Sequence, residues 1–203
     1  MSFNWNKYKN LGPGVRETIR QKEKSQSVDE RTYSENAVKQ DIYPTSIFMR
    51  LGHSSSNQYN GKDTIKIYRS FCNQNHNVWF STDSLAKGMA KGKISEFIKA
   101  IDNGLIVEIY FAIGKNSGGN NEIEYTAQVV DIKSDPDGID SPEKSLTPIE
   151  WCEDKNKTWI KIQKLRPCNN YFTVDDFIVV SSGNILGKVI ANSQYQFGYI
   201  KRG

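Results

Sequence analysis

The sequence has few of the residues from which disulfide frameworks and metal centres are built. Its 203 residues include three cysteines, Cys72, Cys152 and Cys168, with no CxxC pair, and only two histidines, His53 and His76. The odd cysteine count argues against a secreted disulfide framework, and the missing Cys/His spacing argues against a zinc site. Both histidines lie in polar stretches, where we expect them to be solvated rather than catalytic. The sequence therefore predicts no metal ligands and no cofactor.

Long apolar runs are also missing. No segment approaches the roughly 20 consecutive apolar residues that span a bilayer, and residues 1–7 lack the apolar core of a signal peptide. We therefore expect a cytoplasmic protein with no membrane partner. Nucleophile–base pairs, clustered carboxylates and phosphate-binding loops do not occur as sequence motifs either, so the sequence does not predict an enzyme.

The composition is polar, with a mild positive charge. Hydrophobic residues make up 37% and mean hydropathy is −0.62, while 27 Lys+Arg against 23 Asp+Glu give a net charge of +4. Such a charge is compatible with a nucleic-acid partner without requiring one. The polarity concentrates in residues 1–42, which we predict to be an arm that is partly helical (15–24) or disordered. The arm could also contact nucleic acid or a protein partner. Residues 43–203 form the predicted domain.

Hydrophobic alternation predicts a sheet across this domain. The expected strands are 46–51, 64–71, 78–80, 105–113, 122–133, 158–165, 177–180 and 185–190. A helix is expected from Asp83 or Ser84 to Ile101, ending at Asn103-Gly104, and residues 134–157 form a long polar connection. The fold class is therefore α+β, with a small, curved, mainly antiparallel sheet that closes into a barrel flanked by helices.

Two tryptophans lie in polar surroundings. Trp79 belongs to Val78-Trp79-Phe80-Ser81-Thr82, and Trp151 to a charged segment at 150–155. If the two indoles converged, they would make a stacking pocket for a flat or methylated group. The alternatives are a core residue at a strand-to-helix corner for Trp79 and a loop anchor for Trp151. Trp159 alternates with isoleucines and is expected to be a packing residue.

From Ile47 to Ile200 the chain resembles the YTH domain and its EVE relatives in the PUA-like superfamily. Val78-Trp79-Phe80-Ser81-Thr82 is similar to the family's strand ending in Trp-x-Ser-Thr, which leads into its first long helix. The other similar segments are 109–113 and 127–134 (central strands), 151–155 (the Trp-containing loop), 159–162 (the next strand) and 189–193 (an Asn-Ser segment near the end).

The resemblance implies a reader of a modified base that performs no chemistry. Trp79 and Trp151 would form an aromatic cage around the methyl group of N6-methyladenine, and the backbone carbonyl of Phe80 would accept a hydrogen bond from the methylated amine. Ser81 and Thr82 would also lie along the base. Asn57 would read the ring edge, with Asn73 or Asn75 as rivals.

Other residues would meet the nucleic-acid backbone. These are Lys87, Lys91, Lys93, Asn192, Ser193 and Gln194. The three lysines could equally form a solvated helix face, and Gln194 stands where the family has a basic residue. Asn156 stands where some family members have a third cage tryptophan, so 5-methylcytosine or a bulkier base also stays open.

The implied partner is RNA, or DNA that is single-stranded or has the base flipped out. Two other functions stay open: a ribonuclease of the ASCH kind on a PUA-like scaffold, and an adaptor subunit of a defence system. The aromatic tail at 194–202 is expected to be an edge strand, with stacking on nucleic acid as its alternative.

Overall fold

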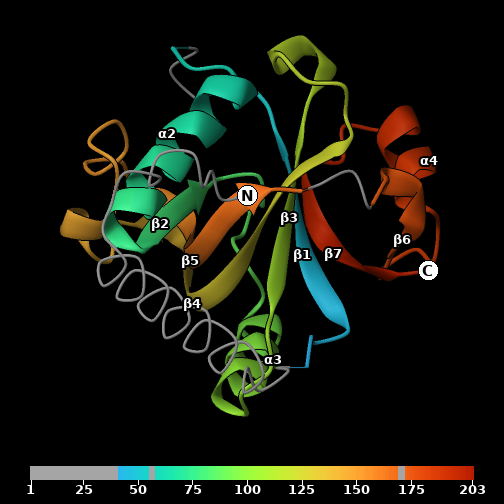
Figure 1. Cartoon of the computed structure of the whole chain (residues 1–203). Helices are drawn as coiled ribbons and strands as arrows, with labels where there is room; N and C mark the ends of the chain where they lie inside the picture. Colours follow the sequence, from blue (N-terminus) through green and yellow to red (C-terminus); the bar gives the residue numbers. More distant parts are fainter. Residues whose placement is uncertain (1–40, 55–57, 169–171) are drawn as a thin grey trace, which may run out of the picture. The chain divides into compact units, whose positions relative to one another are not determined.

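The computed structural model describes residues 41–54, 58–168 and 172–203. This part of the chain forms a mixed α+β fold built on one seven-stranded sheet (Figure 1). The strands are β1 (Thr45–Leu51), β2 (Asn77–Thr82), β3 (Glu108–Ile113), β4 (Ile123–Ile139), β5 (Asn156–Pro167), β6 (Phe177–Val179) and β7 (Phe197–Arg202). The helices are α2 (Gly61–Asn75), α3 (Lys91–Asp102) and α4 (Leu186–Asn192). None of the described helices is long and apolar enough to cross a membrane.

The strand order is β2-β5-β4-β3-β1-β7-β6. Only the β1–β3 pair is parallel; the other pairs within the described sheet are antiparallel. Three register shifts between β4 and β5 bend the sheet. The α+β class and the mainly antiparallel sheet are confirmed, but no pairing among the described residues joins β2 to β6, so the sheet is open rather than a closed barrel. The C-terminal strand β7 lies inside the order, not at its edge.

Four expected elements differ from the observed ones. The polar connection expected over 134–157 is shorter, because β4 continues to Ile139 and β5 begins at Asn156. The expected strand at 64–71 is part of helix α2, because its buried residues Ile65, Tyr68 and Cys72 follow helical spacing and the Asn60 side chain caps the helix by accepting from the Asp63 amide at 2.9 Å. The expected strand at 185–190 is largely helix α4. The helix expected from residue 83 begins only at Lys91.

The arm expected over residues 1–42, with its helix at 15–24, lies outside the described residues except for positions 41 and 42. Ile42 forms an isolated bridge with Ile106. The expected strands near 46–51, 78–80, 105–113, 122–133, 158–165 and 177–180 correspond to β1, β2, β3, β4, β5 and β6.

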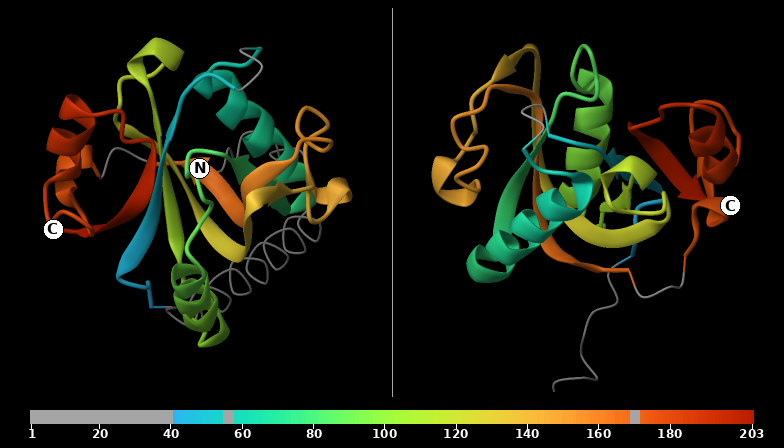
Figure 2. Two further views of the ribbon diagram at one scale, coloured as in Figure 1. Left: turned by 180° about the vertical axis from the view of Figure 1, so that it is seen from behind. Right: turned by 90° about the horizontal axis from the view of Figure 1, so that it is seen from above.

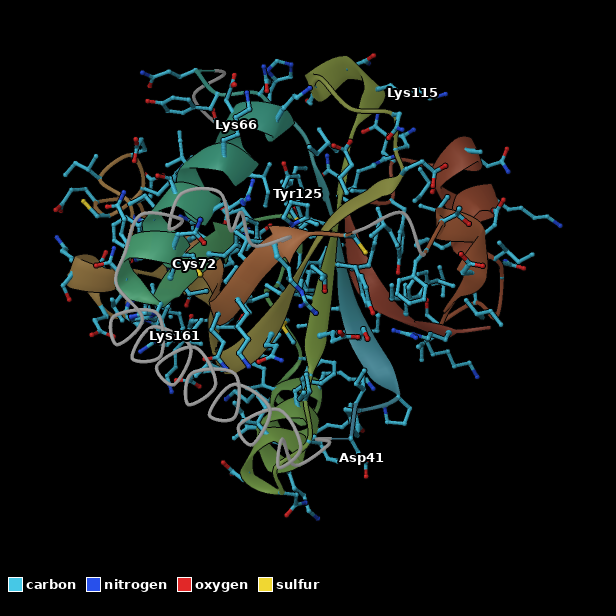
Figure 3. The ribbon with its side chains drawn as sticks, in the orientation of Figure 1. Asp41, Lys66, Cys72, Lys115, Tyr125 and Lys161 are labelled. Atoms are coloured by element: carbon cyan, nitrogen blue, oxygen red, sulfur yellow. The ribbon has the colours of Figure 1, made fainter. Side chains whose placement is uncertain are left out.

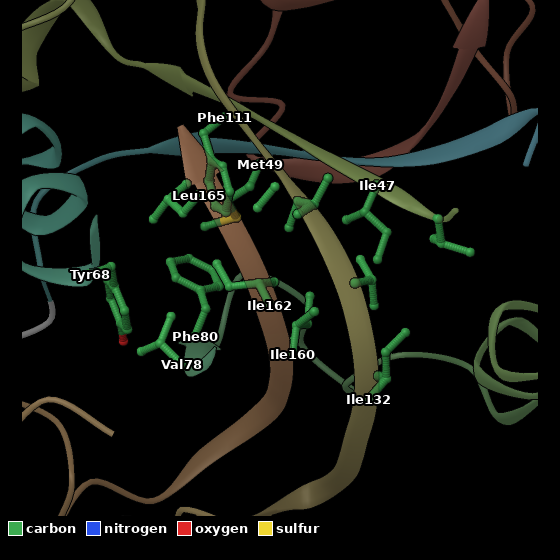
Figure 4. Close-up of a cluster of buried hydrophobic side chains, with 14 of the residues drawn as sticks. Ile47, Met49, Tyr68, Val78, Phe80, Phe111, Ile132, Ile160, Ile162 and Leu165 are labelled. Atoms are coloured by element: carbon green, nitrogen blue, oxygen red, sulfur yellow. The ribbon is translucent and has the colours of Figure 1, made fainter. Parts of the chain in front are cut away.

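Two hydrophobic clusters lie on opposite faces of the central strands. Along β1, Ile47 and Met49 belong to the first cluster and Phe48 to the second, as expected when successive side chains alternate between faces. Helix α2 packs beside β2 and β5 over the first cluster, whereas α4 lies beside β6 (Figures 1 and 2). Figure 4 shows the first cluster, in which Tyr68 of α2 faces Phe80 and Val78 of β2.

Candidate functional site

A cavity of about 350 Å³ opens where the end of β1, the first half of α2, the end of β2 and the loop before β5 meet. We call it the aromatic pocket. Its ring-bearing walls are Tyr68, Phe80 and Trp151, and polar residues complete the lining. Its volume falls within the range of small-ligand pockets, roughly 300–1,000 Å³, although polar residues make up most of its lining.

The aromatic wall is a packed group of rings. The Trp151 indole stacks on the Tyr68 ring, with centroids 4.6 Å apart and planes within 7°. Phe80 lies 5.0 Å from Tyr68, and Tyr59 meets the indole edge-on at 5.8 Å. Because these rings hold one another, the indole is fixed in orientation while 8% of Trp151 stays exposed. Such a preorganised ring suits a flat ligand.

Hydroxyl groups lie beside this wall. Burial raises the pKa of Tyr68, so its hydroxyl keeps its proton at neutral pH. The Ser81 amide donates to the Tyr68 oxygen at 3.4 Å, and the Ser81 hydroxyl is 3.3 Å from the same atom. Further out, the Thr82 hydroxyl donates to Ser84 at 2.9 Å. The pocket therefore offers hydrogen-bonding groups next to a stacking surface.

Charged groups line the pocket as well. The Asp83 carboxylate accepts from the Lys157 amide at 2.6 Å. Burial, and then repulsion by Asp83, raise the pKa of Asp154. The Arg50 guanidinium donates to the Ser193 carbonyl at 3.4 Å.

A second cavity of about 370 Å³ adjoins the first and shares Arg50, Leu51, Gly52 and Gln196 with it. We call it the amide pocket. Its other lining residues come from the loop after β3 and from the segment after α4; they are Gly114, Lys115, Asn116, Ser117, Asn121 and Gln194. Figure 3 shows Lys115 at the same end of the domain as Lys66 of α2 and far from Asp41. The lining of the amide pocket is cationic and polar, without a carboxylate.

The structure does not bring the two predicted cage tryptophans together. Trp151 lines the aromatic pocket but Trp79 does not. In β2, Val78 and Phe80 belong to the first hydrophobic cluster, so Trp79 between them points to the other face, where the Lys161 ammonium lies 5.7 Å from its ring. Trp79 is only 3% exposed, and its indole N–H has no hydrogen-bond partner in the described part of the chain. Phe80 is therefore the β2 ring that lines the same pocket as Trp151.

Four of the residues predicted to contact the base, Phe80, Ser81, Thr82 and Trp151, line one pocket. Asn57 lies outside the described residues, and its rivals Asn73 and Asn75 line neither cavity. Asn156, the position of a third cage tryptophan in some YTH domains, does line the aromatic pocket.

The predicted backbone contacts divide between two regions. Gln194 lines the amide pocket, and the Ser193 carbonyl accepts from Arg50. The Asn192 and Ser193 side chains instead donate to carbonyls of α4.

The three lysines Lys87, Lys91 and Lys93 line neither cavity. Lys93 pairs with Glu96 at 2.7 Å in α3. This helix lies beyond the start of β3 (Figure 1).

Sequence reasoning missed Tyr68, Arg50, Asp83 and Asp154 as pocket residues. The helical spacing of Ile65, Tyr68 and Cys72 could have identified α2 and the face that carries Tyr68. The two aspartates and Arg50 had no such local signal, because they become neighbours only through strand pairing.

Trp159 is fully buried, and its N–H donates to the Ile139 carbonyl at 2.9 Å, which confirms it as a packing residue.

No family model, no curated protein and no solved structure matches this chain. The described residues contain no group of three or more His, Cys, Asp or Glu that could hold a metal ion. The chemistry that the aromatic pocket itself offers is stacking, hydrogen bonding and charge.

Proposed function

We propose that this chain is a nucleic-acid-binding module that holds a modified base, N6-methyladenine in the first place, in the aromatic pocket and does not alter it. The observation that carries the proposal is the stacked Trp151–Tyr68 pair with Phe80 on the wall of a cavity of about 350 Å³. A base on an aromatic side chain gains about 1–3 kcal/mol from stacking. The sequence of residues 47–200 resembles YTH and EVE domains of the PUA-like superfamily, and this resemblance supports the proposed binding of a modified base.

The cage in this proposal differs from the one that the sequence suggested. Trp151 supplies the ring. Phe80 lines the pocket but is only 1% exposed, so it supports the wall from behind, and Trp79 is not part of it. The methylamino group of N6-methyladenine keeps one N–H donor, for which the Phe80 carbonyl and the Ser81 hydroxyl are the candidate acceptors. Burial of its methyl group contributes about 0.8 kcal/mol, or about fourfold in affinity, before any gain from closer packing.

The amide pocket extends the proposed interface. A strand whose base occupies the aromatic pocket continues over Arg50 and toward Lys115, whose cations would meet phosphates. The base must leave a duplex to enter, so the proposed partner is RNA or DNA that is single-stranded or has the base flipped out. A cytoplasmic location is part of the same proposal.

The experiment is a fluorescence-polarisation titration of the full chain. The probes are nine-residue single-stranded RNA and DNA oligonucleotides with a central adenine or N6-methyladenine, at about 0.15 M salt. We expect the methylated probe to bind at least about fourfold more tightly. Equal affinity for the two probes would show that the chain does not read this methyl group.

The same samples separate the reader from the ribonuclease alternative. After the titration, the labelled RNA is run on a denaturing gel. A reader leaves the RNA intact over hours, whereas cleavage products that accumulate with time and protein concentration would assign the pocket to an enzyme.

A further inference from the structure

The charge of the aromatic pocket is unusual for a site that meets a polyanion. Among its charged lining residues, Asp83 and Asp154 are carboxylates and Arg50 carries the positive charge. The Arg50 guanidinium points toward the segment after α4, where it donates to the Ile190 and Ser193 carbonyls at 3.5 and 3.4 Å. These carbonyls engage the guanidinium, and Asp83 and Asp154 are the acidic residues of the lining.

Backbone hydrogen bonds position both acidic residues, Asp154 through its own amide and Asp83 through its carboxylate. The Asp154 amide donates to the Trp151 carbonyl at 3.1 Å, so a tight turn joins this carboxylate to the indole. Asp83 directly follows β2, and its Oδ1 accepts from the Lys157 amide at 2.6 Å. Two segments that lie far apart in the sequence thus present their acidic groups to one cavity.

Neither carboxylate forms an ion pair within the described residues. Asp154 is partly buried, and both its burial and the nearby Asp83 raise its pKa, which means that its negative charge is disfavoured in the unliganded pocket. Asp83 is exposed and accepts from the Lys157 amide, so the cost of the two neighbouring like charges falls on the partly buried Asp154. A ligand that supplies a positive charge or hydrogen-bond donors gains affinity.

We infer that Asp83 and Asp154 make the aromatic pocket select bases that present a positive charge or N–H donors at the ring edge. A cation is also attracted to the face of an indole, so Trp151 and the two carboxylates favour the same ligand. The inference rests on the proposed function, since it names the class of base that this pocket takes. N6-methyladenine presents one N–H donor at that edge, and a ring-methylated, positively charged adenine presents both N–H donors and the charge. A base with a carbonyl at that edge meets repulsion.

The test uses two single-stranded RNA pentamers that differ only in the central base. One carries 1-methyladenosine, which is cationic and has a nitrogen on C6; the other carries 1-methylinosine, which is neutral and has a carbonyl there. Both have the same ring methyl group and the same phosphates. Isothermal titration of the full chain should show the cationic pentamer bound about tenfold to a hundredfold more tightly, the usual range for a hydrogen bond to a charged group.

The variants Asp154→Asn and Asp83→Asn keep the side-chain shape and remove one charge each. We expect each to reduce the preference for 1-methyladenosine several-fold and to leave the affinity for 1-methylinosine equal or higher. Asp102→Asn is the matched control, because Asp102 is an exposed carboxylate at the end of α3 that does not line the pocket. It should leave both affinities unchanged.

The possible results separate the two proposals. If the pentamers bind through Trp151 but with equal affinity, or if both Asn variants keep the full preference, the acidic selection is wrong and the reader function stands. If neither these pentamers nor one with central N6-methyladenosine binds, both proposals are wrong. Both are also wrong if binding is unchanged when Trp151 is replaced by leucine.

Discussion

Replacement of Trp151 by leucine tests the stacking wall directly. Leucine keeps apolar volume in the loop but offers no ring face to a base. Loss of stacking should weaken binding of a methylated oligonucleotide by about 1–3 kcal/mol, which is about 5-fold to 150-fold. The fold should survive: the Trp151–Tyr68 stack contributes about 0.5–1.5 kcal/mol beyond its burial, and the leucine retains part of the packing that a truncation to alanine would lose.

Trp79→Leu is the matched control for this prediction. Trp79 is buried, as Trp151 is, but lies outside the aromatic pocket, so its replacement should lower the melting temperature and change affinity by less than about twofold. Fluorescence polarisation gives the affinities and thermal denaturation gives the stabilities. If Trp79→Leu abolished binding while Trp151→Leu did not, the assignment of the wall to Trp151 would be refuted.

Three further predictions concern stability. The buried Met89 amide donates to the Ser134 hydroxyl at 2.8 Å, so Ser134→Ala should lower the free energy of unfolding by about 1–3 kcal/mol in urea denaturation. A Cβ on Gly61 would lie 2.8 Å from a backbone oxygen of β1. Gly61→Ala should therefore displace α2 and lower the free energy of unfolding by about 1–3 kcal/mol, which thermal denaturation would detect as a lower melting temperature. The hydrogen bond from Lys93 lowers the pKa of Glu96 in the folded protein. The ionised Glu96 therefore contributes stability above the ordinary glutamate pKa, and this contribution is lost as pH falls through the lower folded pKa. The difference in melting temperature between wild type and Glu96→Gln should shrink over that acidic range.

Strands were predictable from the sequence where the hydrophobic pattern fitted a strand and did not fit a helix. The apolar stretches of β1 and β3 are buried on both faces of the sheet, and β5 alternates Ile160, Lys161 and Ile162 as a half-buried strand does. Helix α2 was not predicted, because Ile65 and Ile67 alternate like strand residues over a few positions. The helix is stabilised by contacts that the local sequence does not contain, chiefly burial of its Ile65 and Tyr68 against β2 and β5.

Local sequence predicted part of the aromatic pocket. Trp151 stood out because it lies in a charged segment, whereas Phe80, Ser81 and Thr82 were assigned to the site through the resemblance to YTH domains. The proximity of Asp83 and Asp154 in one pocket was not predictable from the sequence. The two residues become neighbours only because β2 pairs with β5 and the loop before β5 lies beside the end of β2. Such long-range contacts depend on strand order and register, which a single sequence does not specify.

The register of β2 against β5 decides whether Trp79 or Phe80 faces the aromatic pocket. In the β2–β5 register Trp79 is opposite Lys161 and Phe80 is opposite Ile160. Residues that lie opposite each other on paired strands share a face of the sheet. Phe80 of β2 therefore points with Ile160 of β5 into the hydrophobic cluster, and Trp79 lies with Lys161 on the other face. A shift of β2 by one residue would exchange the two rings and expose Val78 to the polar face. The register that buries Val78 and Phe80 therefore also decides that Phe80, and not Trp79, lines the aromatic pocket.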